Sequence, residues 1–238
     1  MDVTDRLYLE DGYAREAEAR VVELRPGGVV LDRTVLYARS GGQPGDAGHL
    51  RWARGEAPVA EALKSEGEVV VHPIAGEPPA IGDTVTVTLD WARRHRHMRM
   101  HTAMHLLCSL TPGIGVTGGQ IGGDKSRLDF DLPDPQPREW WTERLNALVA
   151  EDHPVSFAWI EERELDANPQ LVRTLSVQPP RMGGRIRLVR IGTEATPVDL
   201  QPCGGTHVRS TGEIGRVTVL KLENKGRQNR RISIALEN

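Results

Sequence analysis

The sequence lacks any long hydrophobic run and contains only two cysteines among its 238 residues. A membrane-spanning helix would need about 20 consecutive apolar residues. The N-terminal residues, Met-Asp-Val-Thr-Asp-Arg, are charged where a secretory signal would become apolar. Two cysteines cannot supply a disulfide framework. We therefore expect a cytoplasmic protein, in which a cysteine near histidines is a metal ligand or a small buried residue.

A strong net charge is also absent, since the formal net charge is −3 at pH 7. With 38% hydrophobic and 26% charged residues, the composition is that of a globular protein and excludes a disordered chain, collagen and a coiled coil. Positive charge is nevertheless concentrated in residues 93–99 and 221–231. Such runs usually form a solvated surface. Both flank candidate metal ligands, so a polyanionic partner is a reasonable hypothesis.

The first ninety residues alternate short β-favouring runs with turn residues. Two runs, residues 21–24 and 29–31, flank a Pro-Gly-Gly turn and predict a hairpin. Residues 84–89 alternate threonine with an apolar residue, which predicts a strand with one buried face. No helical period of useful length occurs here. We expect a small N-terminal β-barrel in a domain of residues 1–90.

The hydrophobic period then changes to that of a helix. Apolar residues recur at helical spacing from Met100 to Leu110, Asp90 can cap the N-terminus of this helix, and Pro112 and Gly113 end it. Further predicted strands and a second amphipathic helix follow. Residues 91–238 are therefore predicted to form an α+β domain.

Four side chains that can ligate a metal occur in two pairs about a hundred residues apart. His101 and His105 are four apart, so on a helix both imidazoles project from one face. Cys203 and His207 enclose Gly-Gly-Thr, a sequence flexible enough to bring both side chains to one ion. A thiolate and three imidazoles favour zinc. Cys108 is the alternative thiol, but it lies in an apolar part of the predicted helix, where a cysteine is more often a core residue.

The first histidine pair does not form a metalloprotease motif. Thr102 stands where the glutamate base of His-Glu-x-x-His would be, so peptide hydrolysis lacks its usual proton acceptor. Four protein ligands usually form a closed structural site, whereas a catalytic zinc ion normally keeps one position for water. From these residues alone, the metal could be structural or catalytic.

Together these motifs resemble those of the alanyl-tRNA editing family, which comprises the freestanding AlaX proteins and the editing domain of alanyl-tRNA synthetase. Residues 101–105 and 203–207 match the two zinc motifs of the family, and Arg127-Leu-Asp-Phe130 is similar to one of its strands. Residues 34–48 resemble the glycine-rich motif of medium-length AlaX proteins, with Leu-Tyr-Ala at 36–38 where the family usually has Phe-Tyr-Pro. The resemblance covers nearly the whole chain. It implies a freestanding protein with an N-terminal barrel and an α+β editing domain of the type common to threonyl- and alanyl-tRNA synthetases.

The activity implied by this resemblance is zinc-dependent hydrolysis of the ester in seryl-tRNA(Ala) and, in some members, glycyl-tRNA(Ala). An aminoacyl ester is already activated, so a metal that positions the ester and a water molecule suffices without a glutamate base. The resemblance also implies that Thr34 reads the serine hydroxyl and that Gln120 makes a second polar contact. On β-propensity alone, Thr34 would be an ordinary strand residue.

The expected partner is tRNA(Ala) mischarged with serine, bound by a monomer. The cations expected to contact its phosphates are Arg93, Arg94, Arg96, Lys225, Arg227 and Arg230. Two other functions fit the same residues. One is an RNA-binding module stabilised by a closed zinc site and without turnover, and the other is a hydrolase of small esters or amides.

Overall fold

The computed structural model describes residues 4–175, 178–226 and 229–237. The chain divides into two compact units, Met1–His97 and Met98–Asn238. The division lies within helix α1 (Trp91–Ser109). Asp90 accepts a hydrogen bond from the backbone N–H of Arg93 at 3.1 Å, as expected of a residue that caps this helix. In the part of the chain that the structure describes, no helix has the length and apolar character to span a membrane.

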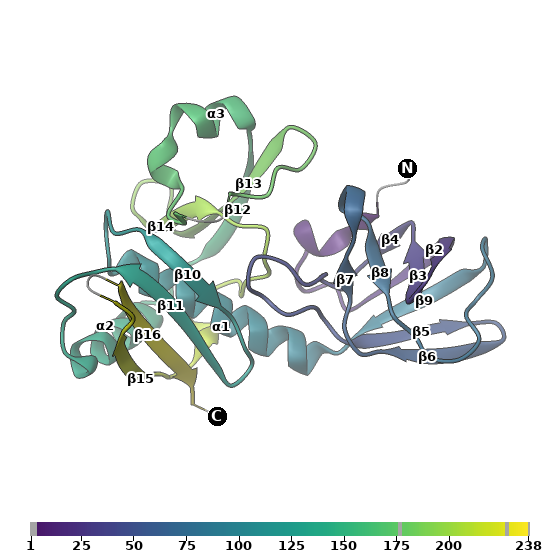
Figure 1. Cartoon of the computed structure of the whole chain (residues 1–238), viewed down its shortest axis with the longest axis horizontal. Coiled ribbons are helices and arrows are strands. Elements are labelled where there is room, and N and C mark those ends of the chain that lie inside the picture. Colours follow the sequence, from purple (N-terminus) through teal and green to yellow (C-terminus); the bar gives the residue numbers. More distant parts are fainter. Residues whose placement is uncertain (1–3, 176–177, 227–228, 238) are drawn as a thin grey trace. The chain divides into compact units, whose positions relative to one another are not determined.

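The first unit contains an antiparallel sheet of seven strands in the order β6-β5-β9-β2-β3-β8-β7 (Figure 1). The predicted hairpin is present, because β2 pairs with β3 around a turn in which Gly27 has a φ of +100°. The seven strands are β2 (Glu16–Arg25), β3 (Gly28–Leu31), β5 (Gly48–Trp52), β6 (Gly55–Val59), β7 (Leu63–Lys64), β8 (Val70–His72) and β9 (Thr84–Leu89). Smaller elements are the parallel pair β1 (Asp5–Arg6) and β4 (Arg33–Thr34), and the 3-10 turns η1 (Leu7–Leu9) and η2 (Glu66–Glu68).

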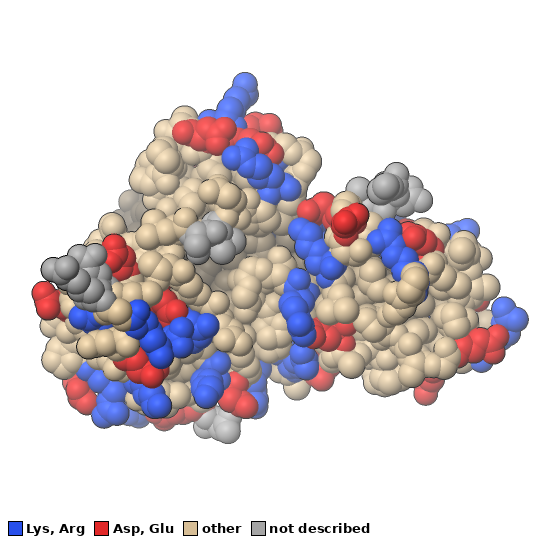
Figure 2. All heavy atoms as spheres, in the orientation of Figure 1, with Lys and Arg blue, Asp and Glu red and all other residues tan. Residues whose placement is uncertain are grey.

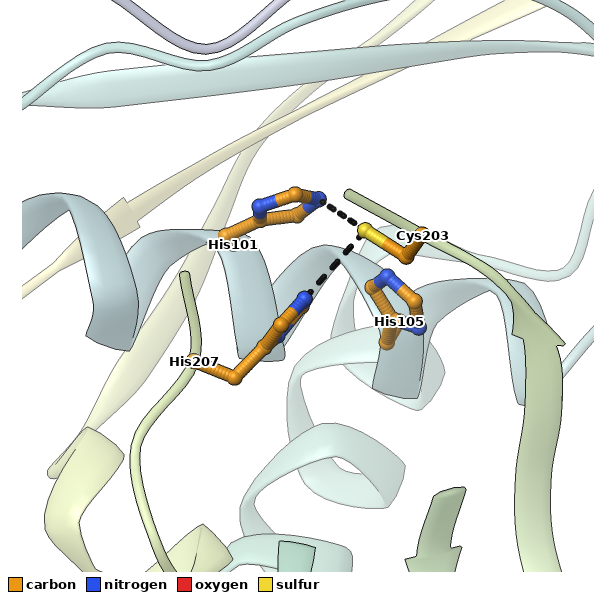
Figure 3. Close-up of side chains that lie close together, drawn as sticks. All are labelled: His101, His105, Cys203 and His207. Carbon is orange, nitrogen blue, oxygen red and sulfur yellow. Dashed lines mark hydrogen bonds between the residues drawn. The ribbon is translucent and has the colours of Figure 1, made fainter. Parts of the chain in front are cut away.

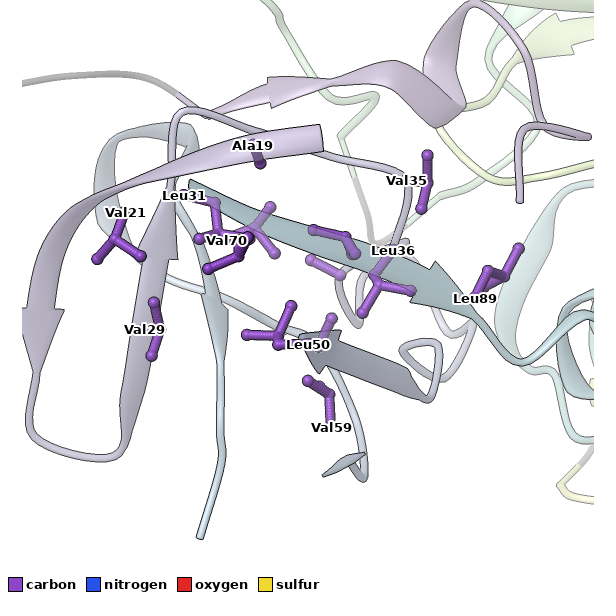
Figure 4. Close-up of a cluster of buried hydrophobic side chains, with 14 residues drawn as sticks. Ala19, Val21, Val29, Leu31, Val35, Leu36, Leu50, Val59, Val70 and Leu89 are labelled. Atoms are coloured by element: carbon purple, nitrogen blue, oxygen red, sulfur yellow. The ribbon is translucent and has the colours of Figure 1, made fainter. Parts of the chain in front are cut away.

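The sheet curls around a core of aliphatic side chains (Figure 4). In β9, Val85, Val87 and Leu89 are buried while Thr84 and Thr88 are exposed, as the alternating sequence predicts. Strands β6 and β7 are the two edges and do not pair with each other among the described residues. Closure of this sheet into a barrel is therefore not confirmed.

A buried ion pair fastens the start of α1 within the first unit. Arg94 is fully buried and donates from Nε to Oδ2 of Asp46 at 2.8 Å. Its two terminal nitrogens also reach the carbonyl oxygens of Gly12, at 2.7 Å, and Val35, at 2.6 Å. Every nitrogen of this guanidinium therefore has a protein acceptor.

The second unit contains two antiparallel sheets. One has the order β10-β11-β16-β15 and is packed against α2, where the amide of Asn146 exchanges hydrogen bonds with the backbone of Val217 at 2.7 and 3.0 Å. Its elements are β10 (Val116–Gln120), β11 (Lys125–Asp131), α2 (Arg138–Ala150), β15 (Val217–Asn224) and β16 (Asn229–Leu236).

The other sheet has three strands in the order β12-β13-β14 and two different faces. One face carries Ile186 and Leu188, which pack against Leu165 of the short helix α3. The opposite face carries Asp199, which accepts a hydrogen bond from His105 of α1, and Gln201, which donates to Asp199. The elements here are β12 (Val155–Glu161), α3 (Glu162–Ala167), η3 (Pro169–Leu171), β13 (Arg185–Gly192), β14 (Pro197–Pro202) and η4 (Thr211–Ile214).

Candidate metal centre

The four side chains expected to bind a metal meet inside the second unit (Figure 3). His101 and His105 project from one face of α1, and Cys203 and His207 come from the loop after β14. The four possible ligand atoms lie within 4.8 Å of one another. The Sγ atom of Cys203 lies 3.3 Å from Nε2 of His207 and 3.5 Å from Nε2 of His101.

The two separations from Sγ of Cys203 fit a tetrahedral metal centre. With metal–nitrogen bonds of about 2.0–2.1 Å and a metal–sulfur bond of about 2.3 Å, neighbouring ligand atoms of a tetrahedron are roughly 3.3–3.7 Å apart. Both distances from Cys203 fall in this range. Borderline metals bind one thiolate and three imidazoles readily. The residues present can therefore hold a metal ion.

Charge within the cluster favours the thiolate that a metal requires. Burial raises the pKa of Cys203, but the imidazoles of His101 and His207 outweigh burial and hold this pKa well below its usual value. Cys108 differs, since burial raises the pKa of its thiol to about 12. Cys108 is also not one of the clustered ligands. The preference for Cys203 over Cys108 thus has a structural basis.

One histidine of the cluster is oriented by a carboxylate. Nδ1 of His105 donates to Oδ2 of Asp199 at 2.8 Å, and the side-chain amide of Gln201 donates to the same oxygen at 2.8 Å. All three side chains are buried. With its proton on Nδ1, His105 presents the lone pair of Nε2 to the other ligands, which is the arrangement that a metal-binding histidine needs.

A second histidine is oriented by a hydroxyl group. Oγ1 of Thr102 lies 3.2 Å from Nδ1 of His207 and donates to the carbonyl oxygen of Met98 at 2.9 Å. The Thr102 hydroxyl oxygen also accepts the N–H of Val208 at 3.3 Å. Because this hydroxyl gives its proton to Met98, it accepts from Nδ1 of His207 and leaves Nε2 free to bind a metal. The residue in the position of the protease glutamate therefore holds a ligand here.

The loop that carries Cys203 is held by a buried arginine. Nη1 of Arg187 donates to the carbonyl oxygens of Cys203 and Gly205, both at 3.1 Å. The N–H of Gly205 points to Sγ of Cys203 at 3.4 Å. Sequence reasoning did not identify Arg187, Asp199 or the role of Thr102. The strand period gives no signal for two of them, because Asp199 alternates with Val198 and Leu200 in β14 and Arg187 alternates with Ile186 and Leu188 in β13.

Of the two polar residues expected to contact the substrate, Thr34 is buried inside the first unit. Its hydroxyl lies 2.9 Å from Nε2 of His72 and accepts the N–H of Leu36 at 3.1 Å. Gln120 ends β10, opposite Arg127 of β11, and is exposed. The two residues belong to different units.

The six expected phosphate contacts have different environments. Arg96 and Lys225 are exposed, Arg93 donates to the carbonyl oxygen of Gly45 at 3.0 Å, and Arg230 donates to that of Pro133 at 2.7 Å. Arg227 lies outside the described residues. Arg94 is fully buried, so it would have to leave its protein partners to reach a phosphate. Lys and Arg side chains also gather over the part of the second unit that carries β11, β15 and β16 (Figure 2).

Two family models match the chain. The model described as "Threonyl and Alanyl tRNA synthetase second additional domain" matches residues 186–233, which include Cys203 and His207. The model described as "tRNA synthetases class II (A)" matches residues 9–93 in the first unit. Both matches are to domains found in aminoacyl-tRNA synthetases.

Individual proteins match over more of the chain. The alanyl-tRNA editing protein AlaX-M of Methanosarcina mazei is 38% identical over 98% of this chain and 97% of its own length. AlaX-M of Methanosarcina barkeri is 39% identical over 98% of this chain and 99% of its own. The alanine–tRNA ligase of Pyrobaculum arsenaticum is 38% identical over 92% of this chain but only 25% of the ligase. On the strength of these nearly full-length matches, the chain belongs to the alanyl-tRNA editing family, whose members are deacylases, hydrolases that act on aminoacyl-tRNA.

Proposed function

We propose that this protein is a zinc-dependent deacylase that removes serine from mischarged tRNA(Ala). The observation that carries the proposal is the buried cluster of His101, His105, Cys203 and His207 in a chain that AlaX-M proteins match along nearly their whole length. Zinc is the metal proposed, because the donor set and the separations around Cys203 suit tetrahedral zinc. The aminoacyl ester would lie beside this cluster.

The chemistry needs little from the protein beyond positioning. When bound, zinc would supply a Lewis acid and lower the pKa of a water molecule near it. Thr102 and Asp199 keep two imidazoles in the orientation that binding requires, and Arg187 holds the loop with the thiolate. The ester is an activated substrate, so the absence of a glutamate at position 102 is no obstacle. Gln120 is proposed as a polar contact to the substrate.

Selection of serine over alanine is assigned to Thr34, whose contacts use two of the three hydrogen-bonding sites of its hydroxyl. Nδ1 of His72 lies 3.1 Å from the carbonyl oxygen of Val29, which can only accept, so Nδ1 carries the proton. Nε2 of His72 then accepts the proton of the Thr34 hydroxyl. With Leu36 donating to the same oxygen, one lone pair remains. A serine hydroxyl can donate to that lone pair and an alanine side chain cannot, which is the kind of contact that discriminates strongly.

Binding of the tRNA is proposed to involve cations at the protein surface. Arg93, Arg96, Lys225 and Arg230 remain candidates, together with Arg227, which lies outside the described residues. Arg94 is left out, because its guanidinium is buried and satisfied within the first unit. Phosphate contacts of this kind make binding weaken as salt is added.

The test is deacylation by the zinc-loaded protein of Ser-tRNA(Ala), Gly-tRNA(Ala) and Ala-tRNA(Ala) in parallel. We expect serine to be released much faster than alanine, and the glycine reaction will show whether the hydroxyl is required. Equal rates for serine and alanine would contradict the proposal. Binding of tRNA without release of any amino acid would instead support an RNA-binding module.

Thr34→Val separates selectivity from chemistry, because valine keeps the shape and removes the hydroxyl. We expect the rate ratio of serine to alanine to fall while the zinc content stays unchanged. Thr117→Val is a matched control, since Thr117 also donates from its hydroxyl to a side chain, that of Asn229, at 3.3 Å. An unchanged ratio in Thr34→Val would remove Thr34 from substrate recognition.

A further inference from the structure

One face of the sheet β12-β13-β14 supports the metal cluster, and this face extends past the cluster to β12. Alternation along the strands places Asp199 and Gln201 of β14 on the same face as Val189 and Ile191 of β13. The cross-strand partner of Val189 on this face is Phe157 of β12. Val189 and Ile191 are buried, whereas Phe157 is 38% exposed. One end of the face therefore lies behind the ligands, and the other end is accessible.

The accessible end carries two aromatic rings, each covered by an arginine. The guanidinium carbon of Arg187 lies 4.5 Å from the ring centroid of Phe157, and that of Arg185 lies 5.0 Å from the ring centroid of Trp159. Trp159 is half-buried and Arg185 is exposed. Phe157 and Trp159 are two positions apart in β12, so both rings project from this same face. We call Phe157, Trp159, Arg185 and Arg187 the aromatic platform.

The platform is joined directly to the metal cluster. Arg187, which stacks on Phe157, donates from Nη1 to the carbonyl oxygens of Cys203 and Gly205. One side chain thus bridges an exposed ring and the loop that carries a metal ligand. A group bound against Phe157 would be a neighbour of a group bound at the cluster.

We propose that the aromatic platform binds unpaired nucleotides at the 3′ end of the tRNA, next to the nucleotide that carries the ester. This inference rests on the proposed function, which puts the ester beside the cluster. Exposed rings flanked by arginines are the usual means of holding single-stranded nucleic acid, because every base has a face that stacks and every linkage carries a negative charge. Glu161, which pairs with Arg185 across the two strands, accepts a backbone N–H at the N-terminus of α3.

The test uses an RNA hairpin that carries no amino acid and ends in a single-stranded 3′ ACCA overhang. The same hairpin with a blunt end is compared with it. Affinities are measured by fluorescence anisotropy with the zinc-loaded full chain. We expect the overhang to increase affinity for the wild-type protein. Phe157→Ala and Phe157→Leu should each weaken binding of the overhang hairpin by roughly 5- to 100-fold and leave the blunt hairpin unchanged. Phe157→Leu keeps apolar volume if the alanine variant does not fold.

Two further variants sharpen the result. Phe157→Tyr keeps the ring and should bind the overhang as the wild type does. Leu220→Ala removes a side chain of similar exposure, 40%, from β15 in the other sheet, and should change nothing. The platform is overturned if the wild-type protein does not distinguish overhang from blunt hairpin, if Phe157→Leu binds with wild-type affinity, or if Leu220→Ala weakens binding equally.

Failure of the platform and failure of the proposed function can be told apart. Binding of RNA that carries no amino acid requires no deacylation. Loss of affinity in Phe157→Leu therefore supports the platform even if no amino acid is released from Ser-tRNA(Ala). In a working deacylase, Phe157→Leu should raise KM for Ser-tRNA(Ala) and leave kcat nearly unchanged. Deacylation with wild-type KM in this variant would overturn the platform and leave the proposed function intact.

Discussion

The hydroxyl oxygen of Thr102 lies 3.2 Å from Nδ1 of His207, although 105 positions separate the two residues in the sequence. Thr102 occupies the place of a catalytic base in the protease motif, yet its hydroxyl donates to the carbonyl oxygen of Met98 and accepts from the imidazole. A carboxylate performs the equivalent task for His105, through Asp199. Two of the candidate ligands are therefore oriented by hydrogen bonds, His207 by a hydroxyl group and His105 by a carboxylate.

Replacing Thr102 by valine should weaken metal binding. The change removes the acceptor of His207 without altering the shape of the side chain, and loss of such a partner typically costs 10- to 100-fold in metal affinity. Zinc affinity is measured by competition with a chromophoric chelator. Thr111→Val is the matched control, because Thr111 is also buried and donates to a backbone carbonyl, that of Cys108, at 3.0 Å. Unchanged zinc affinity in Thr102→Val would show that His207 needs no such partner.

The two cysteines should respond oppositely to substitution. Cys203→Ala removes the thiolate, so bound zinc and deacylation should be lost together. Cys108→Ala should keep both, because its thiol has a pKa of about 12 and lies outside the cluster, and should cost only about 1 kcal/mol of stability. Cobalt substitution gives a direct measurement, since a cobalt–thiolate absorption band should persist in Cys108→Ala and vanish in Cys203→Ala. Loss of the band in Cys108→Ala instead would reverse the ligand assignment.

Arg94→Met should destabilise the first unit rather than weaken RNA binding specifically. The substitution leaves the carboxylate of Asp46 buried without its partner, and breaking a buried pair in this way costs about 3–5 kcal/mol. The measurement is the urea midpoint of unfolding. Arg96→Met, at an exposed position on the same helix, should change stability by less than about 0.5 kcal/mol. A similar urea midpoint for both variants would contradict the structural role of Arg94.

His72 should make stability depend on pH below neutrality. Burial lowers its pKa from 6.5 to about 4, so between these values the unfolded chain binds a proton that the folded chain does not. The stabilising contribution is complete above the unfolded pKa of 6.5 and is lost as the pH falls toward 4. Relative to His72→Gln, which cannot titrate, the wild type should lose about 2 kcal/mol between about pH 7.5 and about pH 5. Parallel curves of unfolding free energy against pH for the two proteins would refute this.

The local pattern of apolar, turn and histidine residues was sufficient to predict features that depend only on nearby positions in the chain. The alternation of residues 84–89 predicted which side chains of β9 are buried, and the Pro-Gly-Gly turn predicted the hairpin of β2 and β3. Spacing of four on a helix was enough to bring His101 and His105 to one face of α1. These predictions hold because the periods of a strand and a helix are properties of the backbone.

Runs of basic residues were a poorer guide to phosphate contacts, because the sequence does not show which arginines are buried. Arg93, Arg94 and Arg96 are close neighbours in one basic run, yet only Arg96 is exposed and Arg94 has no exposed surface at all. The difference arises because Asp46, distant in sequence, supplies a buried partner. A run of arginines therefore predicts a phosphate-binding surface only after the partners of each arginine are known.

The amino-acid sequence by itself determined the ligand types, the helix that carries two of them and the resemblance to the alanyl-tRNA editing family. Only the tertiary structure decided that Cys203 rather than Cys108 joins the histidines, that Thr102, Asp199 and Arg187 hold the ligands in place, and that Phe157 lies on the sheet face that supports them. The physical reason is that each of these contacts joins residues far apart in the chain. Such pairings depend on how strands and helices pack, which no local period encodes.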